Sequence, residues 1–156
     1  MAISVWPFLF FEEWGDRINN KMTADQKQSR VGPISAMWVF ESWISAQDRG
    51  AKHTIVNSAL GNNPVGLGFI DWAHSLSMFW TADDAPSVAA AWSFGDVAKD
   101  DKVVRHVAEQ VQKLKDADVR EVVTRIPAGW LPDVPKPIIV SDLLSRKAKI
   151  DKIVGL

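Results

Sequence analysis

The chain of 156 residues contains no cysteine and no tyrosine. Without a thiol it cannot form disulfides, iron–sulfur clusters, Cys-ligated zinc sites or a cysteine nucleophile. Any metal ion would have to bind to His, Asp, Glu or Asn side chains. An excess of charge is also lacking, because 18 Lys and Arg face 19 Asp and Glu for a net charge of -1. No overall charge attracts a polyanion, so we expect no nucleic-acid partner.

Long apolar runs are missing as well. The aromatic run at 6–11 is far shorter than the roughly 20 residues that a transmembrane helix needs, and Glu12 and Glu13 follow it directly. Residues 1–5 carry no Lys or Arg with which a signal peptide would begin. We therefore expect a cytoplasmic protein without a membrane span, whose aromatic run either packs on the core or forms an exposed docking surface.

The remaining composition is that of one soluble domain, with 47% hydrophobic and 24% charged residues. Eight tryptophans indicate a Trp-rich core or interface. Residues 1–32 read as an aromatic and polar segment, mobile or used for docking, because 15–32 is polar and predicts a loop. Residues 33–156 are expected to form the folded unit.

The apolar pattern changes at Pro33, where helical spacing begins and a proline suits the first helical turn. A largely buried helix is predicted there. The polar stretch 47–53 then predicts a loop, and the β-prone runs 54–60 and 65–71 flank a Gly/Asn/Pro turn. We therefore predict a β-hairpin over 54–71.

The rest of the chain, 85–156, reads as helical. The fold class expected is mostly α with one small β-hairpin, an α+β arrangement. The elements predicted are a short Ala-rich helix over 85–95, a helix over 100–115 with a valine stripe, a helix over 118–126, a Pro-rich turn over 127–137 around Trp130, and a final amphipathic helix over 143–154.

The order of these elements suggests phosphoryl-transfer chemistry. Such a site needs one carboxylate to orient or deprotonate the acceptor hydroxyl, and a second, with a neutral ligand, to hold Mg²⁺ on the nucleotide. Asp48 lies in the predicted loop, His53 follows five residues later, and Asp71 ends the hairpin. Lys52 and Asn57 either contact phosphate or are solvated polar side chains.

Two segments carry a resemblance to a known family. Residues 43–49 (WISAQDR) and 69–74 (FIDWAH) resemble the catalytic and metal-binding segments of HipA-like protein kinases and the related phosphatidylinositol kinases. Those proteins carry Asp-Arg-His-x-x-Asn and then Ile-Asp-Phe-Gly or Ile-Asp-His-Gly. The tail, at 126–131 and 143–150, is similar to the closing helices of bacterial HipA-like proteins.

The resemblance covers roughly 33–156 and implies a kinase-like C-lobe. It implies Asp48 as the catalytic base, Asp71 as a Mg²⁺ ligand and Mg-ATP as the cofactor. The sequence departs from the family pattern at the metal site, where Gly50 replaces a histidine and His53 replaces the metal-binding asparagine. Only about 30 residues precede the predicted catalytic helix, too few for the nucleotide-covering β-lobe with its phosphate-pairing lysine.

Three functions remain open from the sequence. The first is a non-catalytic, pseudokinase-type binding or regulatory module, and the second is a half-kinase that becomes active when a partner supplies the nucleotide lobe. The third is a metal-dependent hydrolase in which Asp48, His53, Asp71 and His74 bind Mn²⁺ or Zn²⁺. The first two predict a protein partner, or a second copy of the chain, at the open surface of the lobe.

Overall fold

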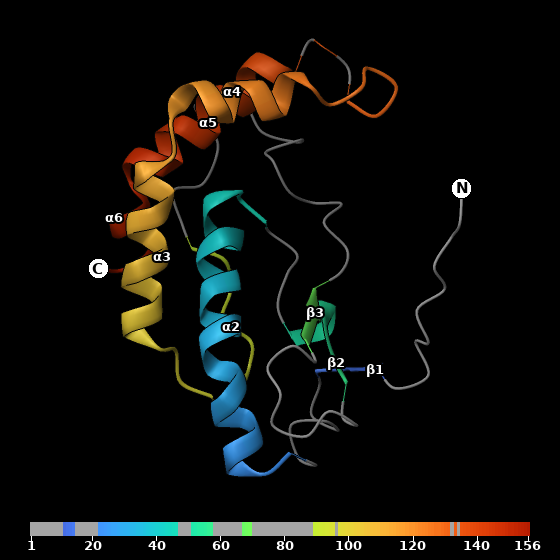
Figure 1. The fold of residues 1–156 in the computed structure, drawn as a ribbon, viewed down its shortest axis with the longest axis vertical. Coiled ribbons are helices and arrows are strands. Elements are labelled where there is room, and N and C mark those ends of the chain that lie inside the picture. Colours follow the sequence, from blue (N-terminus) through green and yellow to red (C-terminus); the bar gives the residue numbers. More distant parts are fainter. Residues whose placement is uncertain are drawn as a thin grey trace.

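The computed structural model describes residues 11–14, 22–46, 51–57, 67–69, 89–95, 97–131, 133 and 135–156. Helices predominate in this part of the chain, as the sequence predicted, and a small antiparallel sheet accompanies them (Figure 1). The elements in chain order are β1 (Phe11–Glu13), α2 (Ala24–Trp43), the 3₁₀ turn η2 (Ala51–His53), β2 (Thr54–Asn57), β3 (Leu67–Phe69), α3 (Asp101–Lys113), α4 (Asp116–Thr124), α5 (Lys136–Ala148) and α6 (Ile150–Val154). No helix within the described ranges has the length and apolar character that crossing a bilayer requires.

Helix α2 is the central element. Figure 1 shows α3 alongside it, α4 and α5 across its C-terminal end, and the sheet on another side. Successive parts of α2 and of the residues just after it enter three apolar clusters: Val31 and Ile34 pack with the sheet, Trp38 and Val39 with α3 and α6, and Ile44 with α4 and α5. Because it contacts every layer, α2 is buried over much of its surface.

The start of α2 differs from the prediction. The loop expected over 15–32 is wrong for 24–32, which is helical, so the boundary expected at 32/33 falls inside α2 and Pro33 lies within the helix. The cause is a capping box: the Thr23 hydroxyl accepts from the N–H of Gln26 (3.2 Å), and the Gln26 side chain accepts from the N–H of Thr23 (2.9 Å). This cap, with the packing of α2, outweighs the poor helix propensity of Gly32 and Pro33.

The predicted hairpin is present in the described strands. Thr54 of β2 pairs with Phe69 of β3, and Val56 pairs with Leu67, in antiparallel register. A third strand, β1, pairs with the other edge of β2 and was not predicted. Trp14, directly after β1, is 1% exposed and packs with Val56 against α2, so the sheet is fastened to the helix by one apolar cluster.

The Ala-rich helix predicted over 85–95 is wrong for 89–95, which contains no helix. The backbone of Ala90 is bonded to α2 instead: its N–H donates to the Ser42 hydroxyl (3.0 Å), and its carbonyl accepts from the Trp38 indole (2.7 Å). One turn earlier on α2, the Ser35 hydroxyl accepts from the N–H of Asp100 (2.9 Å). These long-range bonds replace the intrahelical ones that alanine favours.

The C-terminal helices largely follow the prediction. Helix α3 matches the range 100–115 and is capped by the Asp100 carboxylate, which accepts from the backbone N–H groups of the first turn. Helix α4 begins two residues earlier than predicted. The single final helix predicted over 143–154 is in fact two helices, because α5 ends at Ala148 and α6 begins at Ile150.

Helix α5 joins the other helices through its basic side chains. Each of three cations reaches the C-terminal carbonyls of a different helix, where the helix dipole is negative and the carbonyls lack intrahelical donors. The donors and acceptors are Lys136 to Thr124 of α4, Arg146 to Ser42 and Trp43 of α2, and Lys147 to Leu114 after α3. Residues far apart in the sequence thereby fix the relative positions of the helices.

Candidate functional site

The structure describes only some of the residues of the predicted site. Lys52 and His53 form the end of η2, and Asn57 is the last residue of β2. Asp48, Asp71 and His74 lie outside the described residues, so the pairing of the two carboxylates stays a prediction.

The turn η2 is fixed by bonds on both of its sides. The N–H of Ala51 donates to the hydroxyl of Ser93 (2.8 Å), and the carbonyl of Thr54 accepts from the N–H of Trp14 (2.6 Å). Thr54 is 1% exposed, whereas Lys52 lies on the surface and His53 is half-buried. The arrangement places an exposed lysine beside a half-buried histidine directly before the hairpin.

The end of α2 carries backbone strain directly before the predicted loop. Ser45 has a φ of 56° although it is not glycine, and it is buried. The N–H of Ala46 donates to the carbonyl of Glu41 (2.9 Å), which is the six-to-one bond of a Schellman motif. A left-handed non-glycine residue is unfavourable, and such residues concentrate where the surrounding structure holds a functional segment.

Arg146 fixes the same helix end from α5. Its Nε donates to the carbonyls of Ser42 (3.1 Å) and Trp43 (3.0 Å), and its Nη2 also donates to Ser42. Burial lowers the pKa of Arg146, and the carboxylate of Asp142 opposes that shift. The indole of Trp43 donates to the carbonyl of Leu143 (3.0 Å), so α5 holds both the backbone and a side chain at the point where the predicted loop leaves α2.

The imidazole of His53 affects which metal ion the candidate site could bind. Mg²⁺ prefers hard oxygen ligands in octahedral geometry, and an imidazole nitrogen suits Mn²⁺ or Zn²⁺ better. His53 stands where the resemblance calls for an amide oxygen. Within the described ranges, no group of three or more His, Asp or Glu side chains is placed to hold a metal ion. The described donor therefore does not fit Mg²⁺, and we derive no catalytic step through Mg-ATP.

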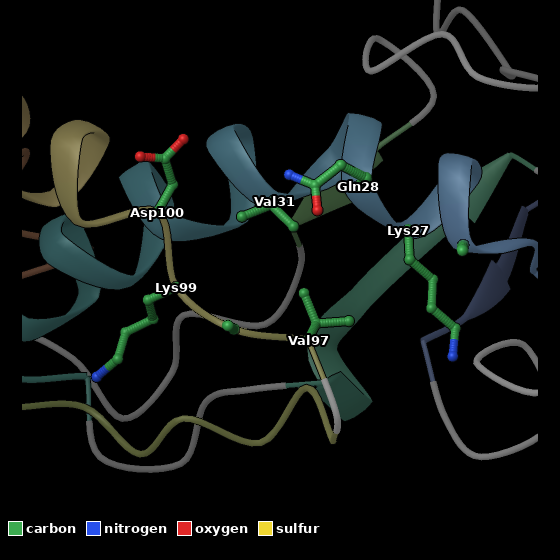
Figure 2. Close-up of a pocket in the computed structure, with 8 residues that line it drawn as sticks. Lys27, Gln28, Val31, Val97, Lys99 and Asp100 are labelled. Carbon is green, nitrogen blue, oxygen red and sulfur yellow. The ribbon is translucent and has the colours of Figure 1, made fainter.

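A cavity of about 370 Å³ lies between the first half of α2 and residues 97–100. Figure 2 shows Val31 and Val97 on facing elements at its apolar centre, and Lys27 and Lys99 at opposite ends. The ammonium of Lys99 lies 3.8 Å from the centre of the Trp38 ring, a cation–π contact. The two lysines do not converge in this view, so the cleft presents no single anion-binding centre. No motif in the sequence predicts this cavity, because its described walls come from segments about 70 positions apart.

Comparison with protein-family models, with curated proteins and with solved structures found no match to this chain.

Proposed function

We propose that the chain is a kinase-like C-lobe that serves as a non-catalytic binding module. The observation that carries this proposal is the order of elements around the candidate site. A long, buried α2 leads through η2 into the antiparallel β2–β3 hairpin, and Val56 of that hairpin packs back on α2. This order of helix, loop and hairpin is the one in which the sequence predicts the carboxylates of a phosphoryl-transfer site.

The chemistry of the site favours binding over catalysis. Phosphoryl transfer depends almost entirely on positioning and on electrostatic stabilisation by bound metal cations and basic side chains. His53 supplies a nitrogen where the resemblance calls for an amide oxygen, and Gly50 supplies no side chain where it calls for a histidine. A site altered in both positions keeps the two carboxylates, Asp48 and Asp71, but lacks the neutral oxygen ligand and the histidine of the family pattern.

An exposed tryptophan supports the binding role. Trp130 is 85% exposed, and its backbone N–H donates to the carbonyl of Pro127 (2.8 Å). The next residue, Leu131, donates to the same carbonyl (3.0 Å) and is buried against α4 and α5. The two backbone bonds fix the turn from which a large aromatic side chain extends into solvent, and tryptophan is typical of binding hot spots.

Thermal unfolding tests the catalytic alternative. The chain is heated with and without Mg²⁺ or Mn²⁺ and a nonhydrolysable ATP analogue, and Asp71→Ala is measured in parallel. A ligand at 100 times its Kd adds about 2.7 kcal/mol, which is roughly 5–10 °C for a domain of this size. We expect no shift. A shift that needs both metal and nucleotide, and that Asp71→Ala abolishes, would establish the half-kinase instead.

A second measurement tests the binding surface. Trp130→Ala removes the exposed ring and should leave the thermal unfolding temperature unchanged, because the side chain contributes little to the core. We expect wild-type chain to retain a partner, or a second copy of itself in sedimentation, that the variant loses. Leu114→Ala, at a 37% exposed position beyond the end of α3, is the control and should retain it. Equal retention by all three chains contradicts the proposed surface.

A further inference from the structure

A second cavity, of about 400 Å³, lies between the C-terminal half of α4 and the first turns of α5. The described residues that line it are Arg120, Thr124, Asp133, Lys136, Pro137 and Val140, and none of these belongs to η2, β2 or β3.

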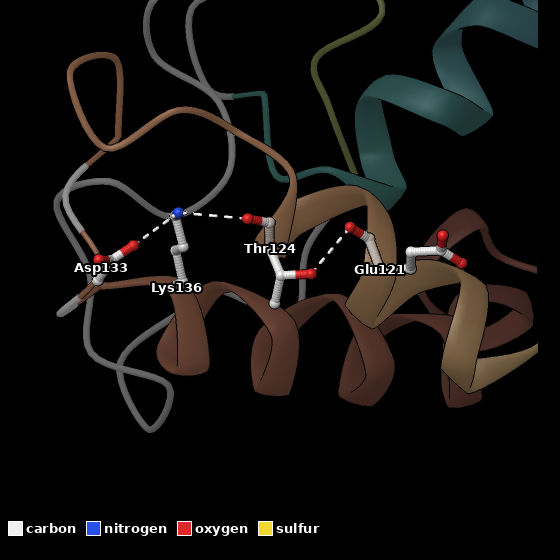
Figure 3. Close-up of polar contacts among 4 residues, drawn as sticks. All are labelled: Glu121, Thr124, Asp133 and Lys136. Atoms are coloured by element: carbon white, nitrogen blue, oxygen red, sulfur yellow. Dashed lines mark hydrogen bonds and ion pairs between the residues drawn. The ribbon is translucent and has the colours of Figure 1, made fainter.

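A buried cation stands in the wall of this cavity. Lys136 is only 8% exposed, and its Nζ donates to the carboxylate of Asp133 (2.7 Å) and, over a longer distance, to the carbonyl of Thr124 (3.4 Å). Figure 3 shows the ammonium between these two acceptors. An ammonium has three N–H donors, so one donor is left over for a ligand after these two bonds.

The charges of the described lining residues do not cancel. Arg120 and Lys136 contribute two positive charges, and Asp133 contributes one negative charge, so these residues carry a net charge of about +1. Asp133 forms an ion pair with Lys136. The Asp133 side chain is 79% exposed and the Lys136 side chain only 10%, so solvent screens the charge of the carboxylate more than that of the ammonium. The first turn of α5, which adjoins the cavity, has no side-chain cap, and its positive dipole end adds to the same field.

Two of the described lining residues are apolar. Pro137 presents a ring without a backbone N–H, and Val140 is 5% exposed one turn further along α5. A ligand that matches this wall has one negative charge at one end and a compact apolar body at the other, as sites for small molecules commonly require.

We propose that this cavity binds a small monocarboxylate with a compact apolar body. The carboxylate accepts from the remaining donor of Lys136 and from the guanidinium of Arg120, in charge-assisted hydrogen bonds. The apolar body lies against Pro137 and Val140. The site is independent of the candidate site described above, since none of its described lining residues belongs to the segments 43–49, 69–74, 126–131 and 143–150 that carry the resemblance.

Benzoate is the probe for this site. It is titrated into the ¹⁵N-labelled full chain, and amide shifts of Thr124, Lys136 and Val140 are followed. Benzamide is the neutral control of the same shape, and inorganic phosphate is the anion without an apolar body. We expect saturable shifts at these amides with benzoate in the millimolar range and none with either control compound.

Two substitutions test which positively charged side chains bind the benzoate carboxylate. Arg120→Ala should weaken benzoate binding about five- to tenfold, because one charge-assisted bond is lost. Arg125→Ala is the matched control at the C-terminal end of α4, since Arg125 is exposed and is not among the residues that line the cavity, and it should leave the affinity unchanged. Lys136→Met should abolish binding, and the Arg120→Ala result decides the matter if this variant does not fold.

The proposal is overturned by any of three results. The first is no saturable shift at these amides with millimolar benzoate. The second is an equal response to benzoate and benzamide, which would make the carboxylate irrelevant. The third is an unchanged benzoate affinity in Arg120→Ala.

Discussion

Replacing Arg146 with methionine should strongly destabilise the protein. Arg146 is 2% exposed, and it donates to the carbonyls of Ser42 and Trp43 at the C-terminal end of α2. Methionine has similar length and apolar character but no donor. The variant therefore leaves two buried carbonyls without this cation, and it leaves the buried carboxylate of Asp142 without the positive charge beside it.

The expected loss follows from these contacts. Breaking a buried charged interaction by removing one partner destabilises a protein by about 3–5 kcal/mol. At 2–4 °C for each kcal/mol in a domain of this size, the melting temperature should fall by roughly 6–20 °C. Arg146→Lys keeps the charge but replaces the planar fork by a single ammonium, so we expect an intermediate loss of about 1–3 kcal/mol.

Urea unfolding followed by tryptophan fluorescence measures these differences. Arg125→Met is the matched control, because the Arg125 side chain is 77% exposed and pairs with Glu121 in the i, i+4 arrangement at the surface. Its loss should not exceed about 0.5 kcal/mol. Equal slopes against urea for all variants show that stability, and not the compactness of either state, has changed.

The outcome that refutes this reasoning is a loss below about 1 kcal/mol in Arg146→Met, or a loss equal to that of Arg125→Met. Adding Asp142→Asn to Arg146→Met gives a further check, because neutralising the carboxylate that faces the lost cation should recover part of the stability. If the double variant is as unstable as the sum of the two single variants, the two side chains are not coupled.

Substitutions at three other positions test separate parts of the fold. Gly32→Ala should stabilise the chain by about 0.5–1 kcal/mol in the same urea assay. Among the described residues, the added Cβ meets only the Val103 side chain, at 3.8 Å. A measured loss of stability would show that the alanine methyl group is sterically crowded. Thr23→Ala should destabilise it by about 1 kcal/mol and Thr23→Ser by much less, since the hydroxyl caps α2; equal losses would contradict the cap. Asp116→Asn should lower stability at neutral pH. The hydrogen bond from Lys147 lowers the pKa of the Asp116 carboxyl, so its contribution is present above about pH 4 and is lost as pH falls through the lower folded-state pKa. The urea midpoints of variant and wild type should therefore converge in acid, and a constant gap would show that charge is not the cause.

Local patterns in the sequence predicted the elements whose stability is local. The valine stripe and flanking charges located α3 to within one or two residues, and the two β-prone runs located the β2–β3 pairing. Side chains three or four apart share a helix face, and alternate residues share a strand face, so these elements are readable without knowledge of their partners. The capping box at Thr23 was equally readable, and it marks the true start of α2 ahead of Gly32 and Pro33.

Other features depended on partners distant in the chain. Residues 89–95 have the composition of a helix, but Trp38 and Ser42 bond the backbone of Ala90 and keep this segment irregular. Strand β1 exists because β2, more than 40 residues later, offers it an edge. No local sequence pattern predicts such bonds. In both places tertiary contacts, and not the intrinsic secondary-structure propensity of the segment, determine the conformation.

For the candidate site, the sequence by itself determined the chemistry: which carboxylates, histidines and lysines are available, and the order of helix, loop and hairpin that carries them. The tertiary structure decided how the end of α2 is held, with Arg146 reaching Ser42 across 104 positions and Ser45 kept in a left-handed conformation. It also formed the cavity around Lys136 between two helices. The physical reason is that composition and periodicity belong to single segments, whereas burial, helix capping at long range and cavities exist only between segments once they have packed.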